Sequence, residues 1–141
     1  MNDITLLWAS TAEQKAQCFA IRQEVFVEEQ HFTREFDATD DTALHLLAAS
    51  QGVPMATARL FQENGVWVVG RSCVRKPFRK LGLGRLLLSA AEQKARELGA
   101  QELILSAQNR AMGFYEKCGY QAVGTGHYED DCPHTDMKKT L

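Results

Sequence analysis

The sequence Arg79-Lys80-Leu81-Gly82-Leu83-Gly84 lies at the centre of the most informative part of the chain. It is preceded by Val66-Trp67-Val68-Val69, an apolar run of strand length that is rich in β-forming residues. It is followed by residues 85–98, in which apolar side chains recur at helical spacing up to Gly99, a typical helix-ending residue. The pattern therefore predicts a strand, a short basic turn that contains glycine, and a helix that begins at the turn.

The predicted turn has the properties of an anion-binding site. Backbone N–H groups in the first turn of a helix have no partner within the helix, and the helix dipole adds partial positive charge there. Gly82 and Gly84 carry no side chain that would keep a ligand away from these N–H groups. Basic side chains are also concentrated in this part of the sequence, at Arg71, Arg75, Lys76, Arg79, Lys80 and Arg85. We expect a multiply charged anion, such as a phosphate ester, to bind here.

Two common phosphate-binding loops do not fit the sequence. A P-loop requires four residues between its glycines, followed by Lys and then Ser or Thr, and this chain has no such motif. The dinucleotide fingerprint requires a third glycine three residues after Gly84, where this chain has Leu87. The turn belongs to neither class.

The composition describes an ordinary globular chain. We expect its 141 residues to form one domain, residues 1–141, because this length can bury a substantial core. Hydrophobic residues make up 45% of the chain and its net charge is −2, a balance that disfavours nucleic acid as the main partner. No apolar run approaches the roughly 20 residues that span a bilayer, and no signal peptide is evident. These features predict a cytoplasmic protein without a membrane partner.

The four cysteines are expected to be free thiols. Cys18, Cys73, Cys118 and Cys132 are widely spaced, as is usual in a cytosolic chain that forms no disulfides. A zinc site built from Cys118, His127, Cys132 and His134 can be drawn, but the usual Cys-x-x-Cys spacing is missing. We predict no bound metal.

The N-terminal part is predicted to contain a strand at residues 4–8 and then a helix. Ser10 and Glu13 have the spacing of a capping box, which predicts that the helix begins near Thr11. The helix leads into the acidic segment 22–30, with Glu24, Glu28 and Glu29. These glutamates fit either a solvated helix end or a pocket for a cationic amine. Residues 32–42 are polar and are expected to form a loop.

The remaining pattern predicts an α/β fold. Strands at 43–49, 55–61 and 66–73 should form an antiparallel meander, with Asn64-Gly65 as a hairpin turn. The helix at 85–98 should cross over to a parallel strand at 102–107. A second helix at 109–117 and strands at 120–124 and 134–141 complete a mixed central sheet with helices on both faces.

Three parts of the chain resemble the GNAT N-acetyltransferases. Arg79-x-x-Gly82-x-Gly84, after a strand and before an amphipathic helix, is similar to the acetyl-CoA signature of that family. The segment Ala107–Tyr120, with Phe114-Tyr115 and Gly119-Tyr120, resembles its closing segment. Residues 21–30 and the ending Glu129-Asp130-Asp131-Cys132-Pro133-His134 are similar to the ElaA/YjcF-like branch. The resemblance covers nearly the whole chain, with one departure: many relatives have glycine where this chain has Lys80.

The resemblance implies acetyl-CoA as cosubstrate and a set of residues that would bind it. Backbone N–H groups of the turn would hold the pyrophosphate, with Arg79 and Lys80 as charge partners. Cys73 and Val74, at the end of a strand, would pair with the pantetheine amides, and Asn109 would lie near that arm. The strands on either side of this arm would splay apart to admit the thioester. The N–H donors implied for the turn are those of Leu81, Gly82, Leu83, Gly84 and Arg85.

The resemblance also suggests catalytic groups. Tyr115 matches the family tyrosine that protonates the departing thiolate as general acid, although a core aromatic residue would have the same helical spacing. A backbone N–H near Val74 would polarise the carbonyl. For the general base we prefer Glu24, because the branch pattern contains a glutamate there. The alternatives are ordered water and the side chains of Glu28, Glu29, His45, His127 and His134.

The expected activity is transfer of an acetyl group from acetyl-CoA to a primary amine, by direct attack in a ternary complex. No Cys–His pairing is evident that would support a covalent intermediate. A catalytically inactive acyl-CoA-binding module of the same fold is the main alternative, and a nucleic-acid-binding protein is a further one that the net charge disfavours. The acidic segment favours a small-molecule amine as acceptor over a protein lysine. A homodimer stays open, since members of the family often dimerise.

Overall fold

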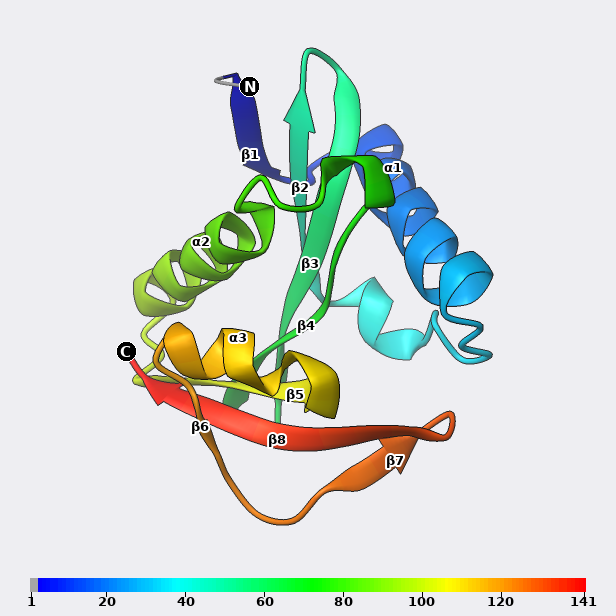
Figure 1. The fold of residues 1–141 in the computed structure, drawn as a ribbon. Coiled ribbons are helices and arrows are strands. Elements are labelled where there is room, and N and C mark those ends of the chain that lie inside the picture. The colour runs from blue at the N-terminus through cyan, green and yellow to red at the C-terminus, as the bar shows by residue number, and fades with distance from the viewer. Residues whose placement is uncertain (1–2) are drawn as a thin grey trace.

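Three antiparallel strands form the centre of the molecule: β2 (Leu44–Ser50), β3 (Val53–Glu63) and β4 (Val66–Val74). The computed structural model describes residues 3–141, and it confirms the predicted meander (Figure 1). The β3–β4 turn consists of Asn64 and Gly65, with φ angles of 53° and 80°. Both angles lie in the left-handed region that an Asn-Gly hairpin turn requires.

The meander extends into a mixed eight-stranded sheet in the order β1-β2-β3-β4-β5-β8-β6, with β7 paired to β8. β1 (Ile4–Trp8) is antiparallel to β2, and β5 (Glu102–Gln108) is parallel to β4 after the crossover helix α2 (Leu83–Glu97). The C-terminal strands are β6 (Gln121–Ala122), β7 (His127–Glu129) and β8 (Cys132–Thr140). The other helices are α1 (Ala12–Arg22), continued by the π-helix η1 (Gln23–Glu29), and α3 (Met112–Lys117) after the 3₁₀ turn η4 (Asn109–Ala111).

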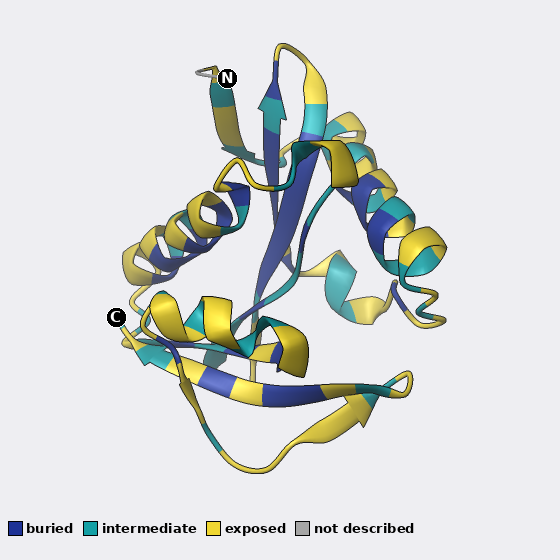
Figure 2. Cartoon of the chain, viewed as in Figure 1, coloured by how far each residue is buried: buried dark blue, intermediate teal, exposed yellow. Residues whose placement is uncertain are grey.

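The sheet is buried on both faces, as the fold prediction required. Adjacent residues of β2 point to opposite sides. Leu46 packs in one apolar cluster with Leu87 of α2, whereas Leu47 packs in a second cluster with Ile21 at the end of α1. Figure 1 shows α1 and α2 on opposite sides of β2 and β3, and Figure 2 shows those strands almost wholly buried. The two faces are called here the α1 face and the α2 face.

The sheet opens between its two halves. β4 and β5 pair in register only at Val68↔Ile104. Beyond this pair β4 contains an irregularity in its pairing with β3, and Arg71 adopts a left-handed φ of 50°. A bulge bends a strand and changes its twist. The second half of β4 therefore diverges from β5, which is the splaying that the family resemblance implies.

Several local predictions were wrong. The capping box is formed by Thr11 and Gln14, because the helix begins one residue later than the Ser10/Glu13 spacing suggests. The loop at 32–42 contains a 3₁₀ helix, η2 (Ala38–Asp41). The connection between the strands predicted at 43–49 and 55–61 is shorter than expected, because Gln51 and Gly52 both take left-handed φ angles and β3 begins at residue 53.

The other differences concern element ends. α2 begins at Leu83, before the predicted start at residue 85. The predicted helix at 109–117 begins as a 3₁₀ turn and becomes α-helical at Met112. β7 was not predicted, and the last strand begins at Cys132, because a two-residue turn at Asp130-Asp131 with φ angles of 49° and 63° joins β7 to β8.

Candidate functional site

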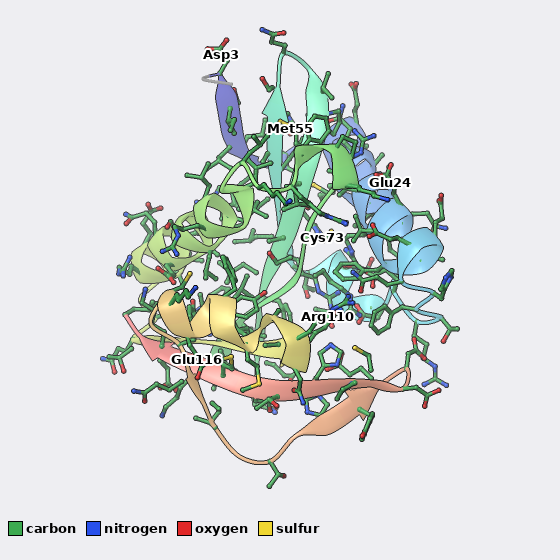
Figure 3. The ribbon with its side chains drawn as sticks, in the orientation of Figure 1. Asp3, Glu24, Met55, Cys73, Arg110 and Glu116 are labelled. Atoms are coloured by element: carbon green, nitrogen blue, oxygen red, sulfur yellow. The ribbon has the colours of Figure 1, made fainter. Side chains whose placement is uncertain are left out.

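The splayed strands border a cleft of about 1450 Å³. Its lining includes Val25 and Phe26 from the π-helix η1 on the α1 face, and Leu88 and Tyr115 from the α2 face. The cleft therefore gives access to both faces of the sheet at the point where β4 leaves β5. Cys73 of β4 and Arg110 of η4 also line it, and both are labelled in Figure 3.

The N-terminus of α2 lacks a cap. Gly82 is the N-cap residue with a left-handed φ of 77°, and no side chain caps the helix. Leu86 is the first residue of the helix whose N–H has an acceptor within it, and this N–H donates to the Gly82 carbonyl at 3.2 Å. The N–H groups of Leu83, Gly84 and Arg85 therefore have no intrahelical acceptor. The space beside Gly82 is open, with no atom within 4 Å of where a Cβ would lie.

The backbone conformation matters at Lys80, whereas the space for a side chain matters at Gly84. Lys80 has a φ of 73°, a conformation that glycine adopts freely and that costs other residues free energy. A glycine at this position would adopt the same conformation without that cost. The φ angle of Gly84 is not left-handed, but a Cβ at this residue would lie 3.3 Å from the Phe114 ring. Gly84 therefore allows α2 and α3 to pack closely.

Arg79 is already engaged by protein groups. Its guanidinium donates to both carboxylate oxygens of Glu29, at 2.7 Å each, and its Nε donates to the Val74 carbonyl at 2.9 Å. This ion pair lowers the pKa of the Glu29 carboxyl, chiefly through the hydrogen bond from Arg79. Arg79, Glu29 and Val74 all line the cleft. The basic turn and the acidic segment are thus joined at one end of the cleft.

The remaining residues expected to bind the cosubstrate lie in different surroundings. Cys73 lines the cleft but is buried, and desolvation raises the pKa of its thiol, so it stays protonated at neutral pH. Leu81 is exposed, whereas the side chain of Leu83 packs in the core. Asn109 accepts a hydrogen bond of 2.7 Å from the Thr135 hydroxyl and is not among the lining residues. Lys80 and Arg85 are exposed on either side of Gly82.

Tyr115 lies on the α2 side of the cleft. Its ring packs edge-on against Phe114 and Tyr120, with centroid distances of 5.1 and 6.1 Å. Burial raises the pKa of its phenol to about 12, so the hydroxyl keeps its proton at any physiological pH. Tyr115 is therefore both a packed aromatic residue and a lining residue that could donate a proton.

The structure does not bring Glu24 or His45 to the cleft. Glu24 lies on the N-terminal helix, where Figure 3 labels it, and it does not line the cleft. Its carboxylate accepts a hydrogen bond of 3.0 Å from Nε of Arg75. The buried His45 ring contacts the Asp40 carbonyl at 3.0 Å through Nε2, and it also lies outside the lining.

The C-terminal strands bring a polar group to the cleft that the sequence reasoning did not assemble. One carboxylate oxygen of Glu129 accepts hydrogen bonds of 2.8 Å from both the Ser106 hydroxyl and Nε2 of His127. Nε2 of His134 lies 3.9 Å from the other carboxylate oxygen. These contacts outweigh the desolvation that opposes them and lower the pKa of Glu129. The Glu129–His134 ending was a signal in the sequence, but Ser106 had none.

An ionic network with two buried arginines borders the cleft, and the sequence did not indicate it. Arg22 donates to Glu35 at 2.8 Å and to Asp40 at 2.7 Å, and Arg59 donates to Asp37 at 2.7 Å and to Asp40 at 2.9 Å. Glu35 and Arg59 line the cleft. The network attaches residues 35–40 to the helix and the sheet. The sequence predicts only a polar loop at 32–42, because the partners of these charges are far away along the chain.

Two further observations concern residues 3–141. Within this range, His, Cys, Asp and Glu side chains form no group of three or more that could hold a metal ion. No helix in the same range has the length and apolar character needed to cross a membrane.

The comparison with known families decides the classification. A family model described as an acetyltransferase (GNAT) domain matches residues 9–141. The chain belongs to the GNAT acetyltransferase family. It is 33% identical over 134 residues to the uncharacterized N-acetyltransferase YjcF of Bacillus subtilis, which covers 93% of this chain and 96% of YjcF.

Solved structures agree with this assignment. An acyl-CoA N-acyltransferase from Pseudomonas aeruginosa is 31% identical, with a TM-score of 0.87 and coverage of 98% of this chain and 99% of that one. Escherichia coli ElaA shares the fold at 24% identity, with a TM-score of 0.86 and 99% coverage of both chains. The resemblance to the ElaA/YjcF-like branch of the GNAT family is thereby confirmed, as is the predicted fold class.

Proposed function

We propose that this GNAT protein transfers an acetyl group from acetyl-CoA to a primary amine, by direct attack of the amine in a ternary complex. The observation that carries the proposal is the position of the cleft. It opens where β4 leaves β5, it is lined by Gly84 at the uncapped N-terminus of α2, and Tyr115 lies on its wall. The cleft could therefore hold an acyl thioester between an anion-binding turn and a proton donor.

The turn fits a pyrophosphate. The N–H groups of Leu83, Gly84 and Arg85 are free of intrahelical acceptors, and the open space beside Gly82 lets an anion approach them. The N–H groups of Leu81 and Gly82 would complete the binding turn. Lys80 and Arg85 would add charge at the rim, and Arg79 would join them on release from Glu29.

The end of β4 fits the rest of the cosubstrate. The N–H of Arg75 bonds to the Met55 carbonyl on β3 at 2.9 Å. Because backbone groups alternate in direction along a strand, the N–H of Val74 points away from β3 and toward the gap beside β5. Cys73 and Val74 would pair with the pantetheine amides, and the Val74 N–H would polarise the acetyl carbonyl. Asn109 would lie beside the pantetheine arm.

The chemical step requires three proton movements. The ammonium nitrogen loses one proton before it attacks the acetyl carbon, and it loses a second proton to solvent once the C–N bond has formed. When the C–S bond breaks, Tyr115 donates its phenolic proton to the departing sulfur and is reprotonated from solvent. The raised pKa of Tyr115 suits this role, because the phenol is fully protonated before the step. To act as the base, Glu24 would need to leave Arg75, which donates to its carboxylate at 3.0 Å.

We propose a small-molecule amine as acceptor and the cytoplasm as the site of action. The four cysteines are free thiols, as suits a reducing compartment. The acceptor proposal is supported by carboxylates on the cleft wall, at Glu29, Glu35 and Glu129.

The function is tested by incubating the protein with acetyl-CoA and a panel of amines that includes spermidine, aniline, free lysine and a lysine-containing peptide. Thiol release and the mass of the product are measured together. We expect amine-dependent thiol release and an acetylated small amine. Binding of acetyl-CoA without transfer to any amine would favour the inactive acyl-CoA-binding module.

A further inference from the structure

We propose that His134 takes the proton from the acceptor amine and that Glu129 holds the ammonium group of that amine beside it. This inference rests on the proposed function, and it names the general base and the acceptor subsite.

The tautomer of His134 is set by its neighbour. Nδ1 of His134 lies 2.9 Å from the backbone carbonyl of Cys132, a group that can only accept a hydrogen bond. The hydrogen of the neutral ring is therefore on Nδ1, and the lone pair is on Nε2. The ring is buried, and it lines the cleft. His134 thus presents a basic nitrogen whose orientation is fixed by a backbone contact.

His127 is oriented in the opposite way. Its Nε2 lies 2.8 Å from a carboxylate oxygen of Glu129, so this nitrogen carries the hydrogen and donates it. The two rings are stacked, with a centroid distance of 5.9 Å and an interplanar angle of 26°. His127 therefore positions Glu129 and packs against His134, and it offers no lone pair at Nε2.

Glu129 and His134 leave a position for a shared donor. One carboxylate oxygen of Glu129 is used by Ser106 and His127, whereas the other lies 3.9 Å from Nε2 of His134. This distance is too long for a direct hydrogen bond, and both atoms are acceptors while His134 is neutral. An alkylammonium carries several N–H donors and one positive charge. It can donate to the carboxylate and to the imidazole at once, and the carboxylate stabilises the imidazolium after proton transfer.

The sheet places this pair opposite the proton donor. Leu105 and Ala107 of β5 pack in the core on the α2 face, so the intervening Ser106 and the following Gln108 face the α1 side. Gln108 is paired in register with His134 and donates to Gln30, at the end of η1, at 2.9 Å. Tyr115 packs against the α2-side core. The amine would thus lose its proton on one face, and the sulfur would receive one on the other.

The surroundings of His134 contain both basic and acidic side chains. Arg110 lines the cleft and donates to Gln108 at 2.8 Å. Phe32 packs edge-on against the ring at 6.3 Å, and Gln108 is its register partner on β5. Asp136 lies two residues further along β8 and also lines the cleft. Asp130 accepts two hydrogen bonds from Thr33, at 2.7 and 2.9 Å, which hold the β7–β8 turn next to the loop that carries Phe32. The carboxylates of Glu129 and Asp136 nevertheless favour a cation beside His134.

The test compares His134→Asn with wild type. An asparagine amide can keep the hydrogen bond to the Cys132 carbonyl, but it has no titratable nitrogen in place of Nε2. We expect unchanged acetyl-CoA affinity and a loss of kcat/KM of about 10²- to 10⁴-fold with spermidine, an alkylammonium. With aniline, which is uncharged at neutral pH, we expect a loss of at most about tenfold. His45→Gln, at a buried histidine outside the cleft, is the matched control and should slow both amines equally.

The outcomes distinguish a wrong assignment of the base from a wrong proposed function. Equal losses with spermidine and aniline, or a His134→Asn variant as active as wild type, would overturn the assignment of the base and leave the acetyltransferase function standing. A wild-type protein that binds acetyl-CoA but acetylates neither amine would overturn both. In the supporting case, Glu129→Gln should raise KM for spermidine more than it lowers kcat, since its carboxylate holds the ammonium.

Discussion

Arg79 and Glu29 are 50 residues apart in the sequence, and their side chains form two hydrogen bonds of 2.7 Å at the edge of the cleft. We propose that the same arginine assists phosphate binding. The Glu29 carboxylate therefore occupies the position on Arg79 where a phosphate of acetyl-CoA would bind. Binding of acetyl-CoA would then exchange one anion for another. This exchange also frees Glu29 for the acceptor side of the cleft.

Glu29→Gln should strengthen binding of acetyl-CoA. Exposed ion pairs contribute about 0.2–1 kcal/mol, so removal of this competitor is expected to lower Kd by up to about fivefold at low salt. The difference should shrink as salt is added. Calorimetric titration measures both effects. Glu28→Gln, at the neighbouring exposed glutamate, is the control and should leave Kd unchanged. Weaker binding by Glu29→Gln would show instead that the ion pair prepares Arg79 for the phosphate.

Tyr115→Phe should lower kcat and leave acetyl-CoA binding intact. Loss of a general acid costs about 10²- to 10⁴-fold, whereas the ring still packs between Phe114 and Tyr120. The phenol works while protonated, and its pKa is raised to about 12. The wild-type rate should therefore show no loss from Tyr115 deprotonation up to about pH 11. A variant with wild-type kcat would mean that the side chain is only a packing group.

Lys80→Gly should stabilise the fold. The left-handed φ of 73° costs a lysine about 1 kcal/mol that glycine does not lose, although glycine also gains freedom in the unfolded chain. We expect a net gain of up to about 1 kcal/mol in the free energy of unfolding, measured by urea denaturation. Lys76→Gly, at a neighbouring lysine outside the left-handed region, should destabilise the protein. A loss of stability in both variants would contradict the strain argument.

Asp40 should make the fold sensitive to acid. Hydrogen bonds from Arg22 and Arg59 outweigh desolvation and lower the pKa of Asp40 from 3.8 to about 2. A lowered pKa stabilises the folded state above pH 3.8, and this stabilisation is lost as the pH falls through 2. The shift corresponds to about 2 kcal/mol. Asp40→Asn should therefore be less stable than wild type at pH 7, and the difference should disappear near pH 2. A constant difference at every pH would exclude a charge effect.

The fold could be predicted from the sequence because its signals are local. The hairpin at Asn64-Gly65, the helix at 83–97 and the crossover to residues 102–108 follow from short-range patterns. The turn that we propose binds the cosubstrate is also one continuous segment. The acceptor side is different, because Ser106, Glu129 and His134 come from three strands and meet only through the register of β5, β7 and β8.

Contacts between distant segments are what the sequence could not show. Glu24 was preferred as the base because the branch pattern contains a glutamate there, and in the structure Arg75, far along the chain, engages its carboxylate at 3.0 Å. The segment 32–42 was expected to be a polar loop, but its Glu35 is buried against Arg22. Charge pairs between distant segments cannot be read from either segment alone.

The most direct test of the account is a calorimetric titration of acetyl-CoA into wild type, Arg85→Glu and Arg96→Glu. Both exposed arginines are on α2 and both variants change the charge equally, but only Arg85 adjoins the uncapped N-terminus. A glutamate in the first helical turn suits the helix dipole, so Arg85→Glu should fold normally. The account predicts micromolar binding to wild type and Arg96→Glu, and at least tenfold weaker binding to Arg85→Glu. Equal affinities in all three proteins, or no binding to folded wild type, would contradict it.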